Sequence, residues 1–174
     1  MSNGMYDADT IIAALKSRKW PMADLVRIAH AVAQCGRTTT SVLGQYGEDL
    51  VVEAFGGTAA PVSQKAYDVR TPNHGDLQVK TFSVGKRPGN IRSFTHDVVT
   101  LEVDPSTAAV VSAELYKAAD LYAAFQAKHT AKFAALGMVF GGHQEDTFER
   151  GWTIPAGLPA TDITDLFRES ALGR

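Results

Sequence analysis

The sequence contains a single cysteine, Cys35, so it cannot close an internal disulfide, and no cysteines and histidines stand at zinc-ligand spacing. It has no apolar run near the roughly 18 residues that a membrane-spanning helix needs. The opening residues, MSNGMYDADT, lack the basic and apolar regions of a secretory signal. These absences predict a protein of a reducing, cytoplasmic compartment that has no membrane partner.

An excess of positive charge is also missing, because 17 Lys and Arg stand against 19 Asp and Glu, for a net charge of −2. The total hides an asymmetry. Residues 1–96 hold 11 Lys and Arg against 8 Asp and Glu, whereas residues 97–174 hold 6 against 11. Within residues 64–92, six basic side chains face two acids, which leaves a local charge of +4. The sequence therefore excludes a surface that is basic overall. The basic stretch at residues 64–92 can be explained either by a local binding surface for a polyanion or by an ordinary solvated face.

The chain has 174 residues, which suits one domain with a sizeable core. Apolar spacing, caps and glycine stops predict helices near residues 8–19, 21–35, 41–55, 116–136 and 161–170. Strand-like runs lie near residues 62–70, 77–84, 97–103 and 108–115. This order predicts an α/β domain of the α+β type, with a central mixed β-sheet flanked by helices. We place an N-terminal helical extension in residues 1–38 and the main domain in residues 39–174.

Acidic and polar side chains interrupt a predicted hairpin, AYDVRTPNHGDLQVKTFSV, which spans residues 66–84. Asp68 lies in its first strand-like run, although aspartate is depleted in strands. In the second run, Gln78 and Lys80 are two residues apart and therefore share a face. The helix before the hairpin adds Glu48 on the stripe that should face the sheet, where a carboxylate is costly unless it is paired or binds a metal. We expect these four side chains to meet.

The four residue types suit the hydrolysis of a phosphodiester. The carboxylates of Glu48 and Asp68 and the amide oxygen of Gln78 are hard ligands of the kind that Mg²⁺ prefers, with Mn²⁺ as a substitute. The ammonium of Lys80 can hold the attacking water, and the cation would neutralise charge that develops on the phosphate. Simpler interpretations stay open: a solvated strand face for Gln78 and Lys80, a turn hydrogen bond for Asp68, and an ion pair for Glu48.

This arrangement resembles the PD-(D/E)xK nuclease superfamily, the restriction-endonuclease-like proteins. GEDLVVEAFGG resembles the first helix of the family, with Glu48 as the carboxylate of the site. Asp68 matches the aspartate of the second core strand, and the tripeptide QVK, residues 78–80, matches the third-strand motif. The likeness covers roughly residues 40–125. It implies a restriction-endonuclease-like core and metal-dependent cleavage of DNA, with Glu48, Asp68, Gln78 and Lys80 as catalytic residues.

Two positions depart from the family pattern. Tyr67 stands where proline is common, and Gln78 replaces the usual acid, which leaves two carboxylates and favours one bound ion over two. The expected function is a Mg²⁺-dependent DNA endonuclease of the restriction or defence type. The alternative is a catalytically inactive module of the same fold that binds nucleic acid or a protein partner.

Basic side chains on and around the hairpin are the expected contacts with the DNA backbone. They are Arg70, His74, Lys86, Arg87 and Arg92. Because cleavage of both strands of a duplex needs two active sites, a homodimer is the simplest assembly.

Overall fold

The protein is described by a computed structural model that covers residues 13, 16–17, 20–34, 40–61, 67–137 and 151–172. The helices in these ranges are α2 Met22–Gln34, α3 Thr40–Phe55, α4 Ala118–Ala135 and α5 Thr164–Leu172. The strands are β1 Thr58–Ala59, β2 Val69–Thr71, β3 Gly75–Ser83, β4 Asp97–Asp104, β5 Ala109–Tyr116 and β6 Thr161–Asp162. None of the helices in the described ranges has both the length and the apolar character of a membrane span.

Most of the predicted elements are confirmed to within a few residues. They are the helices predicted at residues 21–35, 41–55, 116–136 and 161–170, and the strands predicted at 77–84, 97–103 and 108–115. The helix predicted at 8–19 lies almost wholly outside the described residues, as do residues 62–66 of the first predicted strand. The two-residue strands β1 and β6 were not predicted, because pairs this short have no readable periodicity.

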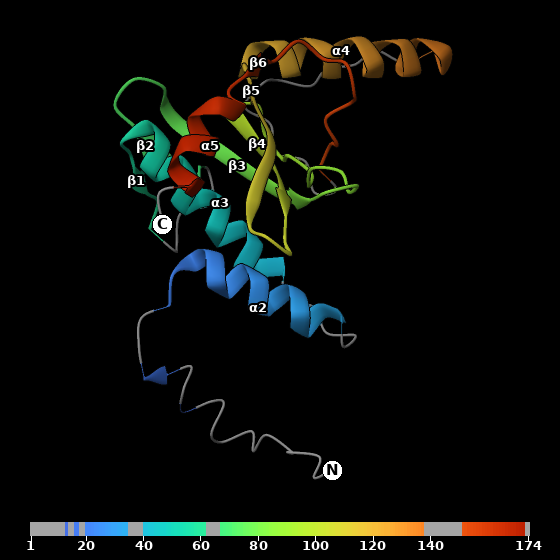
Figure 1. Cartoon of the computed structure of the whole chain (residues 1–174). Helices are drawn as coiled ribbons and strands as arrows, with labels where there is room; N and C mark the ends of the chain where they lie inside the picture. The colour runs from blue at the N-terminus through green and yellow to red at the C-terminus, as the bar shows by residue number, and fades with distance from the viewer. Residues whose placement is uncertain are drawn as a thin grey trace.

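The strands form one mixed sheet in the order β1-β2-β3-β4-β5-β6, in which only β3 and β4 pair in parallel. Parallel neighbours need a long connection that returns the chain to the starting end of the sheet. Residues 84–96 make this return, and we call them the crossover loop (Figure 1). An antiparallel bridge holds the loop, because Ile91 N–H donates to the Trp152 carbonyl at 3.0 Å and Trp152 N–H donates back at 2.7 Å.

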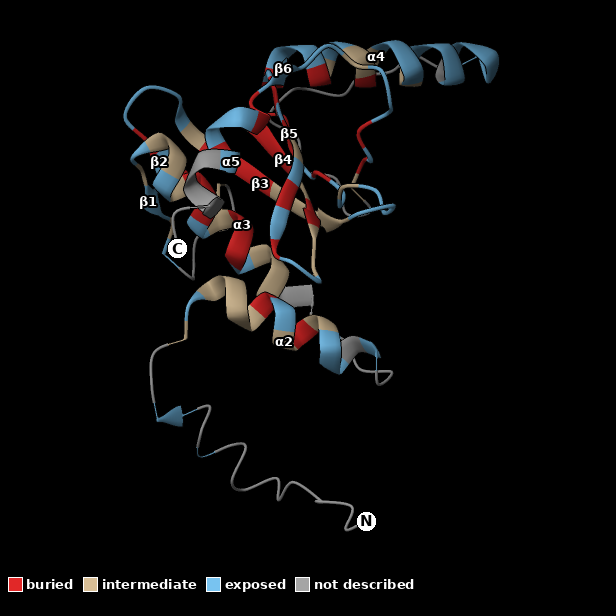
Figure 2. Cartoon of the chain, viewed as in Figure 1, coloured by how far each residue is buried: buried red, intermediate tan, exposed pale blue. Residues whose placement is uncertain are grey.

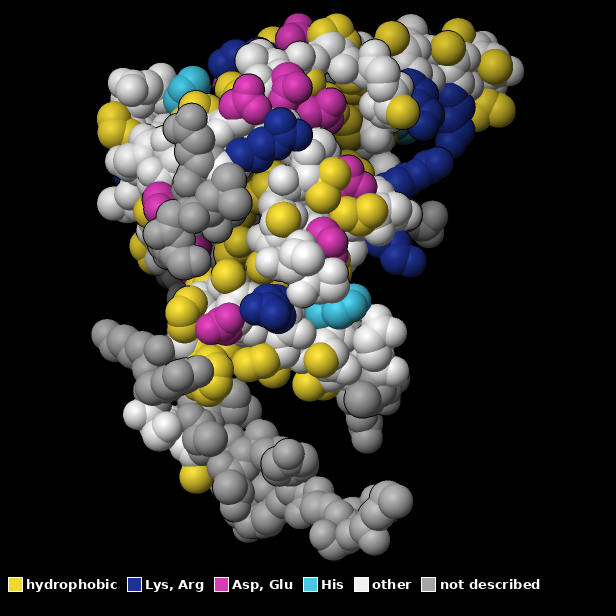
Figure 3. Space-filling model, in the orientation of Figure 1, with side chains coloured by type: hydrophobic (Ala, Val, Ile, Leu, Met, Phe, Trp, Pro, Cys, Tyr) yellow, Lys and Arg dark blue, Asp and Glu magenta, His cyan; other side chains and the backbone are white. Residues whose placement is uncertain are grey.

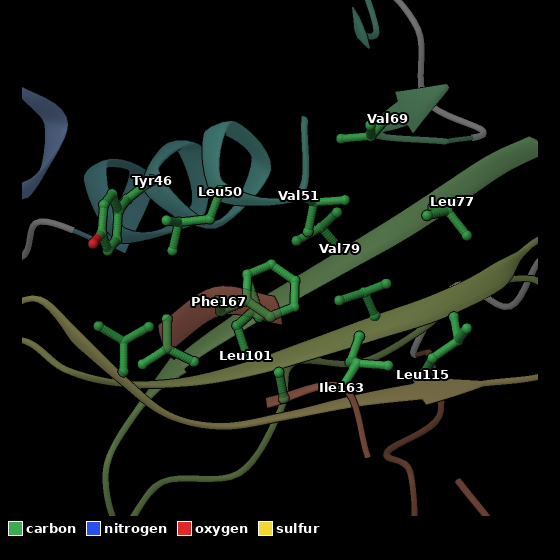
Figure 4. Close-up of a cluster of buried hydrophobic side chains, with 14 of the residues drawn as sticks. Tyr46, Leu50, Val51, Val69, Leu77, Val79, Leu101, Leu115, Ile163 and Phe167 are labelled. Atoms are coloured by element: carbon green, nitrogen blue, oxygen red, sulfur yellow. The ribbon is translucent and has the colours of Figure 1, made fainter. Parts of the chain in front are cut away.

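Helices flank the sheet, and α4 lies at the end of the strands and projects beyond them (Figures 1 and 2). On one face α3 and α5 pack over the central strands, and Val51, Leu101 and Phe167 are fully buried between them (Figure 4). Val26 of α2 belongs to the same core. A second cluster packs α4 and the crossover loop onto the opposite face; its buried members are Ile91, Phe94, Val98, Tyr116, Leu121, Phe125, Trp152 and Ile154. The mixed sheet flanked by helices is therefore confirmed.

Helix α3 approaches β3 very closely at Gly47. A Cβ atom on Gly47 would lie 1.7 Å from Oγ1 and 2.9 Å from Cβ of Thr81, whereas a Cβ on Gly44 would meet nothing within 4 Å. We expect Gly47→Ala to lower the free energy of unfolding by about 1–3 kcal/mol through overpacking. Gly44→Ala on the same helix is expected to raise it by about 0.5–1 kcal/mol through helix propensity. Urea denaturation of both variants measures this, and equal effects would contradict the close contact.

Candidate active site

Asp68 ends the pairing between β2 and β3. Its N–H donates to the Leu77 carbonyl at 2.8 Å, and its carboxylate Oδ2 accepts the Val79 N–H at 2.8 Å. The side chain thus takes the place of a backbone partner, and β2 pairs with β3 only from Val69 to Thr71. Asp68 was predicted within a strand, but the described strand begins one residue later. The reason is that the Asp68 side chain, rather than a backbone carbonyl, accepts the Val79 N–H. Among the described residues, the pairing of β2 with β3 therefore ends next to Val79 and Lys80.

Lys80 follows Val79 in β3 and lies beside the Asp68 carboxylate. Its Nζ lies 3.8 Å from Asp68 Oδ2, and the two side chains are 24% and 31% exposed. The crossover loop passes along the lysine stem, since a Cβ on Gly89 would lie 3.9 Å from Lys80 Cδ. A partly exposed ion pair at this distance contributes little to stability. The arrangement therefore leaves both charges available to a ligand.

Glu48 lies on α3, close enough to Asp68 and Lys80 for both charges to act on its carboxyl. The neighbouring Gly47 packs against Thr81, which is next to Lys80 in β3 and points to the opposite face of the sheet. Glu48 is partly buried, and burial raises the pKa of its carboxyl above the ordinary value. The negative charge of Asp68 raises this pKa further, with a smaller effect from Asp49, and the positive charge of Lys80 opposes them. Glu48, Asp68 and Lys80 therefore interact electrostatically as one group.

Gln78 is placed differently from the other three predicted residues. It shares the face of Lys80 but is 7% exposed, and its Nε2 donates to Ser93 Oγ of the crossover loop at 3.3 Å. The amide oxygen is the atom that a cation would need, and the bond to Ser93 uses the nitrogen. Sequence reasoning missed Ser93, because an isolated serine in a loop has no pattern that marks it as a partner of a strand residue.

Arg70, one of the predicted DNA contacts, is engaged within the hairpin. Its guanidinium donates two hydrogen bonds to the Asp76 carboxylate, at 2.6 and 2.9 Å, and lies 4.9 Å from the centre of the Tyr67 ring. The bonds between them raise the pKa of Arg70 and lower that of Asp76. A phosphate contact by Arg70 would therefore compete with Asp76.

The other predicted DNA contacts lie at opposite ends of β3. His74 lies in the turn before the strand and packs edge-on against Phe55 of α3, with ring centroids 4.9 Å apart. Lys86, Arg87 and Arg92 are exposed in the crossover loop. The nine residues of β3 span roughly 25 Å, so His74 and Lys86 cannot contact the same phosphate. The structure thus groups the three loop residues and separates His74 from them.

The donor set fits a single Mg²⁺ ion. Among the described residues no three His, Cys, Asp or Glu side chains come together as a metal site. Mg²⁺, however, is commonly held by one or two carboxylates and keeps several waters. Glu48 and Asp68 supply two carboxylates, and the pKa of Glu48 is raised first by burial and then by repulsion from Asp68. A cation between them would relieve this repulsion, and the Gln78 amide oxygen is the third candidate ligand.

The raised pKa of Glu48 leads to a test of its burial and of the repulsion from Asp68. A raised pKa means that the folded protein binds the Glu48 proton more tightly than the unfolded chain does, so stability falls as pH rises from 4.5 through the pKa of the folded state and changes no further above it. Glu48→Gln is expected to melt at a higher temperature than the wild type at pH 7 and to lose this advantage below pH 4.5. Mg²⁺ should stabilise the wild type more than the variant.

Glu53→Gln is the matched control, because Glu53 is an exposed glutamate on the same helix. Melting temperatures of the three proteins between pH 3.5 and 8 provide the measurement. If the melting temperature of Glu48→Gln follows that of Glu53→Gln at every pH, the raised pKa of Glu48 is contradicted.

These observations define a mixed-sheet domain in which Asp68 and Lys80 pair beside the start of β2, and in which both charges act on Glu48 of α3. No protein-family model matches the chain, and no curated protein matches it significantly.

Proposed function

We propose that the protein is a Mg²⁺-dependent endonuclease that hydrolyses phosphodiester bonds in DNA, in the manner of restriction or defence enzymes. The observation that supports it is the ion pair of Lys80 with Asp68, whose charges both act on Glu48 of α3. The lysine ammonium lies 3.8 Å from an aspartate that is itself fixed by a backbone N–H. These residues are among the parts that the resemblance to PD-(D/E)xK nucleases requires, with Gln78 in place of the third-strand acid.

Each residue has a role that follows from its position. Glu48 and Asp68 would hold the ion, with Gln78 as a further ligand, and the ion supplies a charge that stabilises the phosphate as it reacts. Lys80 holds the attacking water and favours loss of its proton. The bond from Val79 N–H keeps Asp68 Oδ2 in a fixed orientation. Lys86, Arg87 and Arg92 contact the DNA backbone beside the site, and two copies of the chain provide one site for each strand.

One observation favours a second candidate, a nuclease-fold module that binds nucleic acid or a protein without cutting. The position of the third-strand acid is occupied by Gln78, whose amide donates to Ser93. An amide brings no negative charge to the ion, so affinity for Mg²⁺ is lower than with an acid. Metal-dependent cleavage separates the two candidates.

The experiment is incubation of the purified protein with supercoiled plasmids of mixed sequence in Mg²⁺, Mn²⁺ or EDTA. The proposal predicts nicked and linear products with either metal, none with EDTA, and loss of both products in Glu48→Gln but not in Glu53→Gln. Absence of cleavage in either metal, or equal cleavage by both variants, supports the binding module instead.

A further inference from the structure

A second basic surface lies on α4, outside the hairpin. The outer half of the helix carries Lys128 and Lys132, one turn apart and both exposed. No acid occurs between residues 121 and 137, and none occurs in the crossover loop, residues 84–96. The two segments together carry five Lys and Arg without an acid, in a chain whose net charge is −2. Such a local excess marks a surface for a polyanion.

None of these five cations has an ion-pair partner within the described part of the chain. They are Lys86, Arg87, Arg92, Lys128 and Lys132. One lysine in the last turn is explained by the helix dipole, which favours a cation there, but that accounts for Lys132 alone. The two lysines also act on a neighbouring residue. The pKa of His129 is lowered first by burial and then by the positive charges of Lys132 and Lys128.

Packing joins α4 to the crossover loop and through it to the candidate active site. Phe94 of the loop lies 5.0 Å from Phe125 of α4, and the His129 ring lies 4.1 Å from Phe125 on the next turn, measured between ring centroids. At its other end the loop passes the stem of Lys80 at Gly89. The crossover loop, which carries Lys86, Arg87 and Arg92, therefore connects the surroundings of Lys80 with α4, which carries Lys128 and Lys132.

The outer half of α4 is otherwise uncovered. The helix is anchored by Leu121 and Phe125, whereas almost every described side chain from residue 127 onward is exposed, with Leu136 at 65%. Figure 2 shows this half of α4 projecting from the sheet with an exposed surface. Figure 3 shows Lys and Arg side chains gathered on the side of the molecule where the projecting helix and the crossover loop lie. A helix without packing is marginal in water, so a bound partner would stabilise it.

We propose that the outer half of α4 and the crossover loop form one surface for the phosphate backbone of duplex DNA, leading away from the candidate active site. That the bound polyanion is DNA rests on the proposed function. Lys128 and Lys132 bind phosphates beyond those that the loop contacts, so α4 extends the footprint without reading sequence. Because the contacts are electrostatic and release counterions, each adds about 0.9 to the slope of log affinity against log salt concentration.

The test is fluorescence anisotropy of a labelled 40-base-pair duplex in EDTA, over a series of salt concentrations. The double variant Lys128→Gln/Lys132→Gln is expected to bind about tenfold more weakly at low salt and to lose about 1.8 from the salt slope. The control is Arg27→Gln/Arg168→Gln, which removes the same charge from exposed ion pairs on α2 and α5. It is expected to keep the wild-type slope. Circular dichroism checks that α4 stays helical.

An unchanged slope in the lysine variant, an equal loss in the control, or no duplex binding by the wild type at low salt overturns the proposal. Binding to phosphatidylserine vesicles that needs the two lysines, without duplex binding, assigns the surface to membranes and also overturns it. The plasmid cleavage assay tests the proposed function independently of this binding surface. If the lysines set the salt slope but the protein never cuts plasmid in Mg²⁺, the DNA surface stands and the nuclease assignment falls.

Discussion

Lys80→Met is expected to reduce plasmid cleavage at least about a hundredfold, because under the proposed function it removes the ammonium that holds the attacking water and favours its deprotonated form. Methionine keeps the apolar stem that lies along the crossover loop at Gly89, so packing there is conserved. The ion pair with Asp68 is 3.8 Å long and partly exposed, so its loss should change the free energy of unfolding by less than about 1 kcal/mol. The variant should therefore fold normally and bind DNA, yet fail to cut it.

Lys117→Met is the matched control. Lys117 also pairs with an aspartate, since its Nζ lies 2.8 Å from Asp97 Oδ2, but it lies at the start of α4 beside β4, away from β2. This variant removes the same charge and the same kind of ion pair and should cleave at the wild-type rate. Single-turnover cleavage of supercoiled plasmid, followed on agarose gels, gives the rates. Equal cleavage rates for the two variants would contradict a catalytic role of Lys80.

Asp68→Ala is expected to cost both activity and stability, and a second substitution separates the two. The alanine variant leaves the Val79 N–H without its acceptor at the edge of β3, which costs about 1–3 kcal/mol if water does not replace it. It also removes a carboxylate from the ion. Cleavage should fall below detection, and the melting temperature should fall by several degrees.

Asp68→Asn keeps an oxygen that can accept the Val79 N–H but lacks the negative charge. We expect this variant to have a free energy of unfolding close to that of the wild type. It should still lose cleavage activity, because a neutral amide is a weaker ligand for Mg²⁺. Parallel urea denaturation and plasmid assays measure both properties. If the asparagine variant cuts as well as the wild type, Asp68 has only the structural role of ending the β2–β3 ladder.

Most helices and strands could be predicted from the periodicity of apolar residues. The elements that were not predicted were missed for physical reasons. The alternation in β3 and the apolar runs of β4 and β5 predict strands, because each buries a full face against helices. The parallel pairing of β3 with β4 follows from the path of residues 84–96, which contains no helix to signal a crossover. The two-residue strands are defined by their neighbours alone. Long-range pairing of this kind leaves no local pattern.

The candidate site was predicted in part, for the same reason. Glu48 stood out as an acid on an apolar stripe, and Lys80 as a charge in a strand, so residue type and period indicated both. The bond from Val79 N–H to Asp68 and the bond from Gln78 to Ser93 depend on tertiary placement. The engagement of Arg70 with Asp76 could have been suspected, because the two face each other across a short turn, where opposite charges pair.

The central claim is that Glu48 and Asp68 hold one divalent cation beside Lys80, and calorimetric titration with Mn²⁺ tests it most directly. The claim predicts one ion bound per chain, binding weakened at least about tenfold in Glu48→Gln and in Asp68→Asn, and unchanged binding in Glu53→Gln. Absence of binding by the wild type, or equal binding by all four proteins, would contradict it.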